Sequence, residues 1–228
     1  MYVSPGKSGH SSYPGRSPVD KTPGLMEAFE TFVALALEED GFIVSPAVKF
    51  PVRRRVRKTS RAEFQEHGYE VDLVAARADQ FVLATVKSFL GSRGVAAEAV
   101  TGETTNQRRR GMYRLLNDPV IRDGVLKEAS ERYGYRSNRI EFRLYAGRFA
   151  GRGAGEHERR IREWAKTQRV GAGPIKVIGL DEVVQKVRTA AERKQYRDNA
   201  ALVAVKVLAE AGQLVDRDQA DSSEAEGK

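Results

Sequence analysis

The sequence YEVDLVAARADQFVLATVKSF, residues 69–89, contains two runs of apolar and β-branched side chains separated by a short polar segment. The runs from Tyr69 to Ala75 and from Phe81 to Phe89 have the composition of strands. Residues 77–80, Arg-Ala-Asp-Gln, form a loop short enough to join two antiparallel strands. We therefore predict a β-hairpin over residues 69–89 and place it at the centre of a sheet.

A helix and two shorter apolar runs precede this hairpin. Apolar side chains recur at helical spacing from about Leu25 to Asp40. Residues 42–44 and 47–50 are short β-like runs, which Pro46 and Pro51 interrupt. We expect an edge strand or two from these interrupted runs.

Helical and strand-like patterns alternate after the hairpin. The expected elements, in chain order, are a helix at Ala96–Leu116, a helix at Pro119–Arg132, a strand at Arg139–Phe149, a helix at Glu156–Gln168, a strand at Ile175–Ile178, a helix from Asp181 to about Arg193 and a helix at Asn199–Glu210. Because helices connect successive strands, some strand pairs must be parallel. The sequence therefore predicts an α/β fold with a mixed central sheet flanked by helices.

The length of 228 residues suits one domain with a well-buried core. Residues 1–24 are dominated by Gly, Ser and Pro and contain few apolar side chains, so we expect a flexible tail. Residues 216–228 are short, polar and acidic, and we expect a second flexible tail there. A single α/β domain is then expected over residues 25–215.

The composition excludes several classes of site. The chain has no cysteine, which rules out disulfides, zinc–thiolate sites and thiol nucleophiles. No apolar run is long enough to cross a bilayer, and the N-terminus lacks the pattern of a secretory signal. We therefore expect a cytoplasmic protein with no membrane association.

The charge balance favours a polyanionic partner. Lys and Arg outnumber Asp and Glu by 39 to 31, which gives a net charge of +8. The sequence pI of about 9.7 lies in the range typical of nucleic-acid-binding domains. A membrane surface or an acidic protein would attract the same charge, so the total alone does not select DNA.

Two carboxylates and a lysine occupy strand positions in the predicted hairpin. Strand periodicity places Glu70 and Asp72 on one face of the first strand. Thr85 and Lys87 share a face of the second strand, so a suitable register brings Asp72 and Lys87 to one rim of the sheet. Carboxylate oxygens bind Mg²⁺ or Mn²⁺, and an ammonium group orients water or offsets phosphate charge. This set suits metal-assisted hydrolysis of a phosphodiester, with Asp72 and Glu70 as metal ligands and Lys87 as a catalytic residue.

A third acid, Glu30, lies on the first predicted helix. It is in line with Met26, Val33 and Leu37, so its carboxylate approaches the edge of the core. An unpaired carboxylate there is costly, and a metal ion or a basic side chain would relieve that cost. We therefore include Glu30 among the catalytic and metal-binding residues.

These residues resemble the PD-(D/E)XK nuclease superfamily, which has the restriction-endonuclease-like fold. In that family a helix is followed by three strands, a helix and another strand, and the predicted order over Leu25 to Phe149 is similar. Glu30 resembles the acid on the family's first helix, and Asp72 resembles its metal-binding aspartate. Residues 85–87, Thr-Val-Lys, resemble its acid-x-Lys unit. The resemblance implies an α-β-β-β-α-β core with an additional C-terminal strand and helices, and a Mg²⁺-dependent endonuclease. It also allows a homodimer, because many nucleases of this fold are dimers. No apolar helix face predicted from the sequence supports a dimer independently.

The chain departs from the family pattern at Thr85. The family has a metal-binding acid at this position, and a neutral hydroxyl is a weak Mg²⁺ ligand. Two alternatives follow. Glu70, Glu98 or Glu103 takes over as a ligand, or the site has lost catalysis.

Two basic segments are expected to bind nucleic acid, because guanidinium groups match phosphate geometry. The first lies before the acid-bearing strand and contains Arg53, Arg54, Arg55, Arg57, Lys58 and Arg61. The second contains Gln107, Arg108, Arg109 and Arg110. In some branches of the superfamily a Gln and a Tyr on this helix face the active site, and Gln107 and Tyr113 are similar. Aromatic residues near the basic segments are sparse, which favours duplex DNA over extended single strands.

Three hypotheses remain open at this stage. The first is a Mg²⁺-dependent nuclease. The second is a DNA-binding module on the same fold that has lost catalysis at Thr85. The third is a structural subunit that docks an acidic protein through its basic surface.

Overall fold

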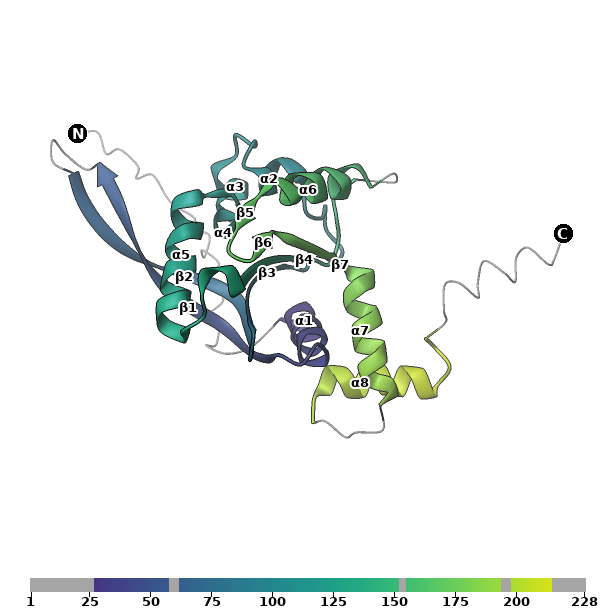
Figure 1. Ribbon diagram of the computed structural model, residues 1–228. Helices are drawn as coiled ribbons and strands as arrows, with labels where there is room; N and C mark the ends of the chain where they lie inside the picture. Colours follow the sequence, from purple (N-terminus) through teal and green to yellow (C-terminus); the bar gives the residue numbers. More distant parts are fainter. Residues whose placement is uncertain (1–26, 58–61, 152–154, 194–197, 215–228) are drawn as a thin grey trace, which may run out of the picture.

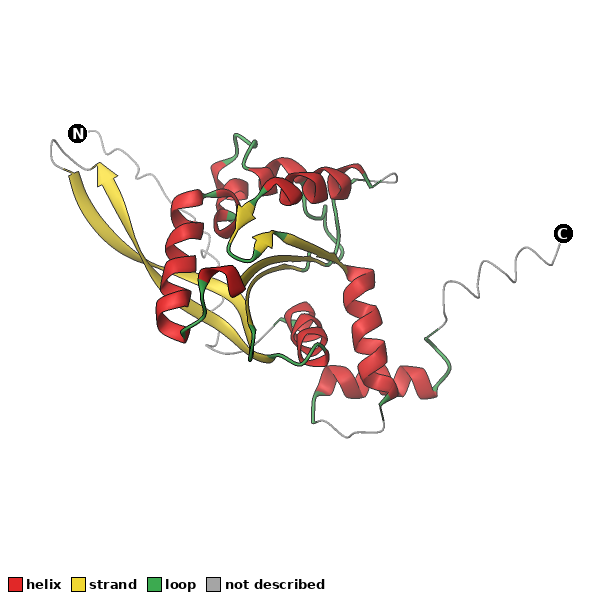
Figure 2. Cartoon of the chain, in the orientation of Figure 1, coloured by secondary structure: helices red, strands yellow, loops and turns green. Residues whose placement is uncertain are grey.

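The computed structural model describes residues 27–57, 62–151, 155–193 and 198–214 (Figures 1 and 2). The predicted tails at residues 1–24 and 216–228 lie outside these described residues. No helix in the described ranges combines the length and apolar character needed to span a membrane.

The centre of the fold is a five-stranded mixed sheet with the strand order β1-β2-β3-β4-β7. The strands are β1 (Ile43–Arg57), β2 (Ala62–Arg77), β3 (Gln80–Lys87), β4 (Ile140–Ala146) and β7 (Lys176–Gly179). The pairs β1–β2 and β2–β3 are antiparallel, whereas β3–β4 and β4–β7 are parallel. The predicted α/β class with a mixed sheet is confirmed, and the predicted hairpin forms as β2 and β3.

Helices cover both faces of this sheet (Figure 1). One side carries α1 (Ala28–Glu39) and α7 (Leu180–Glu192), and α8 (Ala200–Glu210) packs against these two helices. The other side carries α2 (Ala97–Thr101), α3 (Gln107–Gly111), α4 (Arg114–Asn117), α5 (Pro119–Tyr133) and α6 (Glu156–Thr167). A 3-10 turn η1 (Ser137–Arg139) and a small ribbon of β5 (Arg169–Val170) and β6 (Gly173–Pro174) complete the described elements.

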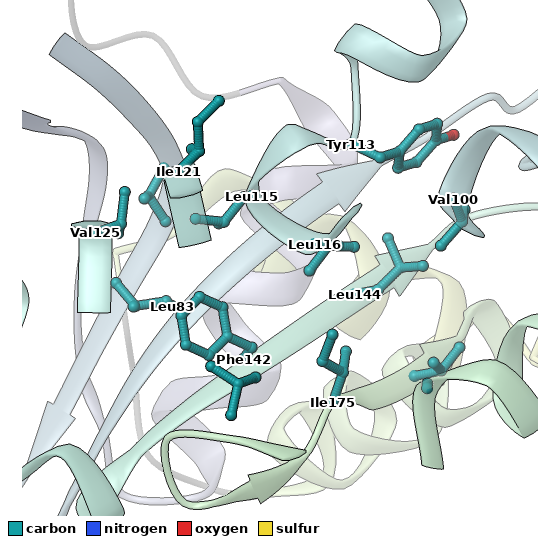
Figure 3. Packing of buried hydrophobic residues seen from close by; sticks show 14 of the residues in the cluster. Leu83, Val100, Tyr113, Leu115, Leu116, Ile121, Val125, Phe142, Leu144 and Ile175 are labelled. Atoms are coloured by element: carbon teal, nitrogen blue, oxygen red, sulfur yellow. The ribbon is translucent and has the colours of Figure 1, made fainter. Parts of the chain in front are cut away.

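Two apolar layers follow from the alternation of side chains along the strands. Leu83, Phe142 and Leu144 face the layer beneath α2 to α6, where Figure 3 shows them packed with Leu116 and Ile121. The alternate positions on β2 and β3 face α1 and α7 and form a second buried layer, which includes Leu73, Ala75, Val82, Ala84 and Val86. Burial of both faces explains why β3 is an almost continuous apolar run.

Several predicted boundaries are corrected by the structure. From Ile43 onward the interrupted runs belong to one long strand, β1, because this strand lies at the edge of the sheet, where proline is tolerated. The single helix predicted at Ala96–Leu116 is three short helices, because Gly102 adopts a left-handed conformation and Asn106 caps a new start. The helix predicted to start at Asp181 begins at Leu180, with Gly179 as its N-cap.

The last helix exposes an apolar face that the sequence analysis did not identify. Val203, Val207 and Leu208 of α8 are exposed, whereas Leu202 and Val205 are buried.

The hairpin of β1 and β2 extends beyond the body of the protein (Figure 1). β1 and β2 pair from Ile43–Ala76 to Arg57–Ala62, but β3 pairs with β2 only from Leu73 to Arg77. The part formed by residues 50–57 and 62–69 is therefore a two-stranded ribbon, which we call the arm. Arg53, Arg54, Arg55 and Arg57 lie on it, and the predicted Lys58 and Arg61 lie outside the described residues.

The base of the arm packs closely on α5. A Cβ atom at Gly124 would lie 2.5 Å from Cγ1 of Val52, a side chain that is only 2% exposed. The side chain of Val52 is β-branched and buried, so a change of its rotamer to make room would cost free energy. Glycine at position 124 therefore permits the contact between α5 and the arm.

We expect Gly124→Ala to lower the free energy of unfolding by about 1–2 kcal/mol, measured by urea denaturation. Overpacking costs about 1–3 kcal/mol, and the better helix propensity of alanine returns up to about 1 kcal/mol. Val52→Ala makes room for the new methyl group. The double variant should therefore lose less free energy of unfolding than the sum of the losses in the two single variants. Strictly additive losses would contradict the close contact.

Candidate functional site

Asp72 lies where β2 and β3 separate. Leu73–Ala84 is the last backbone pair between these strands, and Asp72 and Thr85 are the next residues along them. Oδ2 of Asp72 accepts a hydrogen bond from the backbone N–H of Val86 at 2.7 Å. The carboxylate thus pairs with the Val86 N–H of β3, which at this point no longer has a backbone acceptor on β2.

Lys87 meets the same carboxylate oxygen. Its Nζ donates to Oδ2 of Asp72 at 3.0 Å and to the carbonyl oxygen of Val86 at 3.0 Å. The two side chains are 20% and 23% exposed, so solvent and a ligand can reach them. The structure therefore brings together the two residues predicted to meet at the rim of the sheet.

The end of β3 is held close to β4. The N–H of Gly147 donates to the carbonyl oxygen of Lys87 at 2.9 Å. A Cβ atom at position 147 would lie 2.3 Å from the backbone oxygen of Ser88. Only glycine permits this approach, which fixes the backbone that carries Lys87.

Glu30 lies close enough to both residues to interact with them electrostatically. Burial raises the pKa of Glu30, and the negative charge of Asp72 raises it further. A hydrogen bond from the backbone N–H of Glu27 and the positive charge of Lys87 oppose these effects, but the net direction is upward. Among the described residues, Glu30 of α1 therefore influences Asp72 and Lys87 through charge, whereas only Asp72 and Lys87 contact each other directly.

Backbone strain occurs at two positions beside this group. Among the described residues, Ala47 and Phe89 are the non-glycine residues with positive φ, at 52° and 41°. In the register of β1, Ala47 is level with Asp72, and Phe89 follows Lys87 by two residues. Such conformations cost about 1–3 kcal/mol and are concentrated at functional sites.

A hollow of about 210 Å³ opens over Asp72 and Lys87. β2 and β3 contribute one wall, and the segment from α3 to α5 contributes the other. Its lining residues are Tyr69, Glu70, Asp72, Thr85, Lys87, Gly111, Met112, Arg114, Leu115 and Ile121. We call this hollow the acidic pocket, because the carboxylates of Asp72 and Glu70 line it, whereas Glu30 does not.

Three acids were considered as metal ligands in place of the acid that is missing at position 85, and only one of them lines the acidic pocket. Glu70 lines the acidic pocket and forms an exposed ion pair with Lys49 at 3.7 Å. Glu98 and Glu103 do not line it, because they pair with His157 and Arg160 of α6. Thr85 itself is 4% exposed.

The site contains ligands of the type that Mg²⁺ uses. Asp72 and Glu70 supply carboxylates in the acidic pocket, and Mg²⁺ is often bound by one or two carboxylates together with water and substrate phosphates. Within the described ranges, no group of three or more His, Cys, Asp or Glu side chains is placed to hold a metal ion. The residues present therefore fit a metal that is bound jointly by protein and substrate, and do not form a closed protein cage.

Among the described residues, none of the predicted nucleic-acid-binding side chains lines the acidic pocket itself. Arg54 pairs with Asp118 at 3.9 Å, and Arg53 lies over the ring of Phe64, 4.7 Å from its centroid. The second predicted segment, residues 107–110, forms exposed α3, and none of its members lines the acidic pocket.

Tyr113 does not face the site. It is 1% exposed and packs beside Val100 and Leu116 in the core (Figure 3), and burial raises its pKa. The expectation that Tyr113 faces the site, like the tyrosine of the resembled family, is therefore wrong. The break between α3 and α4 turns Tyr113 inward and leaves the next residue, Arg114, exposed at the pocket.

Arg114, Tyr69 and His67 are the residues that the sequence analysis did not assign to the site. Arg114 and Tyr69 line the acidic pocket and also a neighbouring hollow, which His67 lines as well. The signal for Arg114 was its place four residues after Arg110, the last residue of the basic segment. No family model, curated protein or solved structure matches this chain.

Proposed function

We propose that this protein binds DNA and hydrolyses its phosphodiester bonds with the help of Mg²⁺ or Mn²⁺. The observation that carries the proposal is the contact between Asp72 and Lys87 at the open end of the β2–β3 ladder. An acid beside a lysine in a hollow that substrate can enter is a suitable arrangement for phosphodiester hydrolysis.

The order of elements supports a restriction-endonuclease-like core. The chain runs through α1, the antiparallel strands β1 to β3, the helices α2 to α5 and then the parallel strand β4. This order is similar to the α-β-β-β-α-β core of the PD-(D/E)XK superfamily. Glu30, Asp72 and Lys87 occupy the corresponding positions on α1, β2 and β3.

Each residue has a distinct role in the proposed reaction. Asp72 would be the principal metal ligand, with Glu70 beside it in the acidic pocket and Glu30 of α1 as a helper from outside the pocket lining. When bound, the metal supplies positive charge to the phosphate and lowers the pKa of a coordinated water. Lys87, anchored by Asp72 and the Val86 carbonyl, would direct its ammonium charge to the attacking water or the scissile phosphate.

A second candidate function is DNA binding without cleavage. It is favoured by Thr85, which is buried where the resembled family has a metal-binding acid. In that case Lys87 and Asp72 form a structural ion pair beside the DNA-binding surface.

Cleavage of supercoiled plasmid tests these alternatives. We expect nicking with Mg²⁺ or Mn²⁺, no nicking with chelator, and at least about 100-fold less nicking by Asp72→Asn. Asparagine can still accept the Val86 N–H bond, so the strands should remain in place. Asp79→Asn, in the turn of the same hairpin, is the matched control and should cleave normally. Undiminished cleavage by Asp72→Asn would contradict the proposed site, and retardation of DNA without nicking would favour the second function.

A further inference from the structure

A second hollow, of about 550 Å³, adjoins the acidic pocket. It lies between the arm and the start of α4, and Tyr69 and Arg114 line both hollows. Its polar side chains come from Arg54, Arg55, Gln65, His67, Tyr69 and Arg114. No carboxylate lines it, so we call it the basic groove. A basic groove that continues into an acidic pocket is suited to a polyanion whose reacting phosphate lies at the acidic end.

The guanidinium of Arg114 is available to a ligand. The residue is exposed, and within the described part of the chain its side chain makes no hydrogen bond or ion pair. Arg54 is only weakly engaged, because its ion pair with Asp118 is 3.9 Å long and its own side chain is 43% exposed. Exposed ion pairs of this kind contribute little and are easily exchanged for a phosphate.

The two faces of the arm differ. Strand alternation places Val52 and Arg54 on the face that turns toward α5 and the basic groove, together with Gln65 and His67 of the paired strand. Arg53 lies on the opposite face, where it covers the ring of Phe64, and it does not line the basic groove. Arg55 shares that face by alternation but does line the groove. Arg53 and Arg54 are thus adjacent arginines on one strand that point to opposite sides.

An exposed two-stranded ribbon is also the right shape for duplex DNA. The major groove of B-DNA admits a two-stranded β-ribbon. Between residues 50 and 69 the sequence has six basic and two acidic residues. An isolated ribbon gains little stability by itself, so a bound partner accounts for its length and charge better than packing does.

We propose that the arm lies in the major groove of duplex DNA, while Arg54 and Arg114 hold phosphates of the strand that enters the acidic pocket. This inference deepens the proposed function, on which its placement of the reacting strand rests. It assigns a phosphate-binding role to Arg114, which no sequence pattern had placed in the site.

Binding of a labelled 30-base-pair duplex, measured by fluorescence anisotropy in chelator so that no cleavage occurs, tests the inference. At moderate salt, Arg54→Gln and Arg114→Gln should each weaken binding by about tenfold and reduce the slope of log K against log salt by about one. Arg159→Gln removes the same charge from an exposed position on α6 that lines neither hollow, and its binding should stay within about twofold of the unchanged protein. Thermal unfolding of each variant checks that the fold is retained.

The outcomes separate this inference from the proposed hydrolysis. Equal losses for Arg159→Gln and Arg114→Gln would overturn the basic groove as the binding surface, even if the protein cleaves plasmid. Tighter binding of a single strand of the same length would overturn the ribbon placement. Selective losses in Arg54→Gln and Arg114→Gln without any cleavage by the unchanged protein would support the groove and contradict the hydrolysis.

Discussion

Replacement of Lys87 with methionine is expected to reduce metal-dependent cleavage of supercoiled DNA by about 100-fold or more while DNA binding in chelator changes little. Removal of one preorganised charged or hydrogen-bonding group from a reaction site has effects of about this size. Methionine keeps the length of the side chain but loses the ammonium that contacts Asp72 and the Val86 carbonyl. The measurement is the initial rate of nicking at saturating protein.

A matched control is Lys127→Met on α5. Lys127 is 70% exposed and pairs with Glu131 along its own helix, so its loss should leave the nicking rate within about twofold. Equal nicking by Lys87→Met and the unchanged protein would remove Lys87 from the mechanism. Arginine at position 87 is expected to restore little activity, because its planar, branched group does not reproduce a compact ammonium.

The largest expected effect on stability comes from Glu141 in β4. Its carboxylate accepts hydrogen bonds from Arg143 at 2.8 Å and from Lys176 at 2.8 Å, and Arg143 is only 8% exposed. Glu141→Gln leaves the buried guanidinium without its compensating charge. We expect the free energy of unfolding at pH 7 to fall by about 3 kcal/mol, measured by urea denaturation.

The pH dependence of this difference provides an internal check. Burial alone would raise the pKa of Glu141, but the hydrogen bonds and charges of Lys176 and Arg143 outweigh it and lower the pKa below 4.5. A lowered pKa in the folded state adds stability above the unfolded value, and that stability is lost as the pH falls through the folded value. The gap between the unchanged protein and Glu141→Gln should therefore close on acidification.

A paired substitution separates the charge effect from simple loss of packing. Glu141→Leu with Arg143→Met replaces both charges by apolar groups, and it should recover most of the stability that Glu141→Gln loses. A double variant that is less stable than Glu141→Gln would show that these residues act through their shape and not through the compensation of a buried charge.

The contact between Asp72 and Lys87 was predictable because it depends on local structure. A turn of two residues, Ala78 and Asp79, closes the hairpin, and the pair Arg77–Gln80 then sets the register for both strands. Strand alternation brings the carboxylate and the ammonium to the same edge. The chemical types of the two side chains suggested phosphodiester hydrolysis, which remains our proposal.

The arm was not predictable from the same periodicity. Pro46 and Pro51 interrupt the β pattern, and only their place in an edge strand explains why β1 continues through both. The change from one long helix to α2, α3 and α4 had local signals in Gly102 and Asn106. Those signals did not tell which way Tyr113 and Arg114 would face.

The sequence by itself determined the α/β class, the central hairpin, the basic charge and the residues able to perform the proposed chemistry, because composition and short-range periodicity specify these features. Only the tertiary structure decided that Glu30 approaches Asp72 and Lys87 and that Arg114 joins the arm to form the basic groove. These relations connect segments far apart in the chain. They depend on how α1 and α3 to α5 pack against the sheet, and no local pattern encodes that packing.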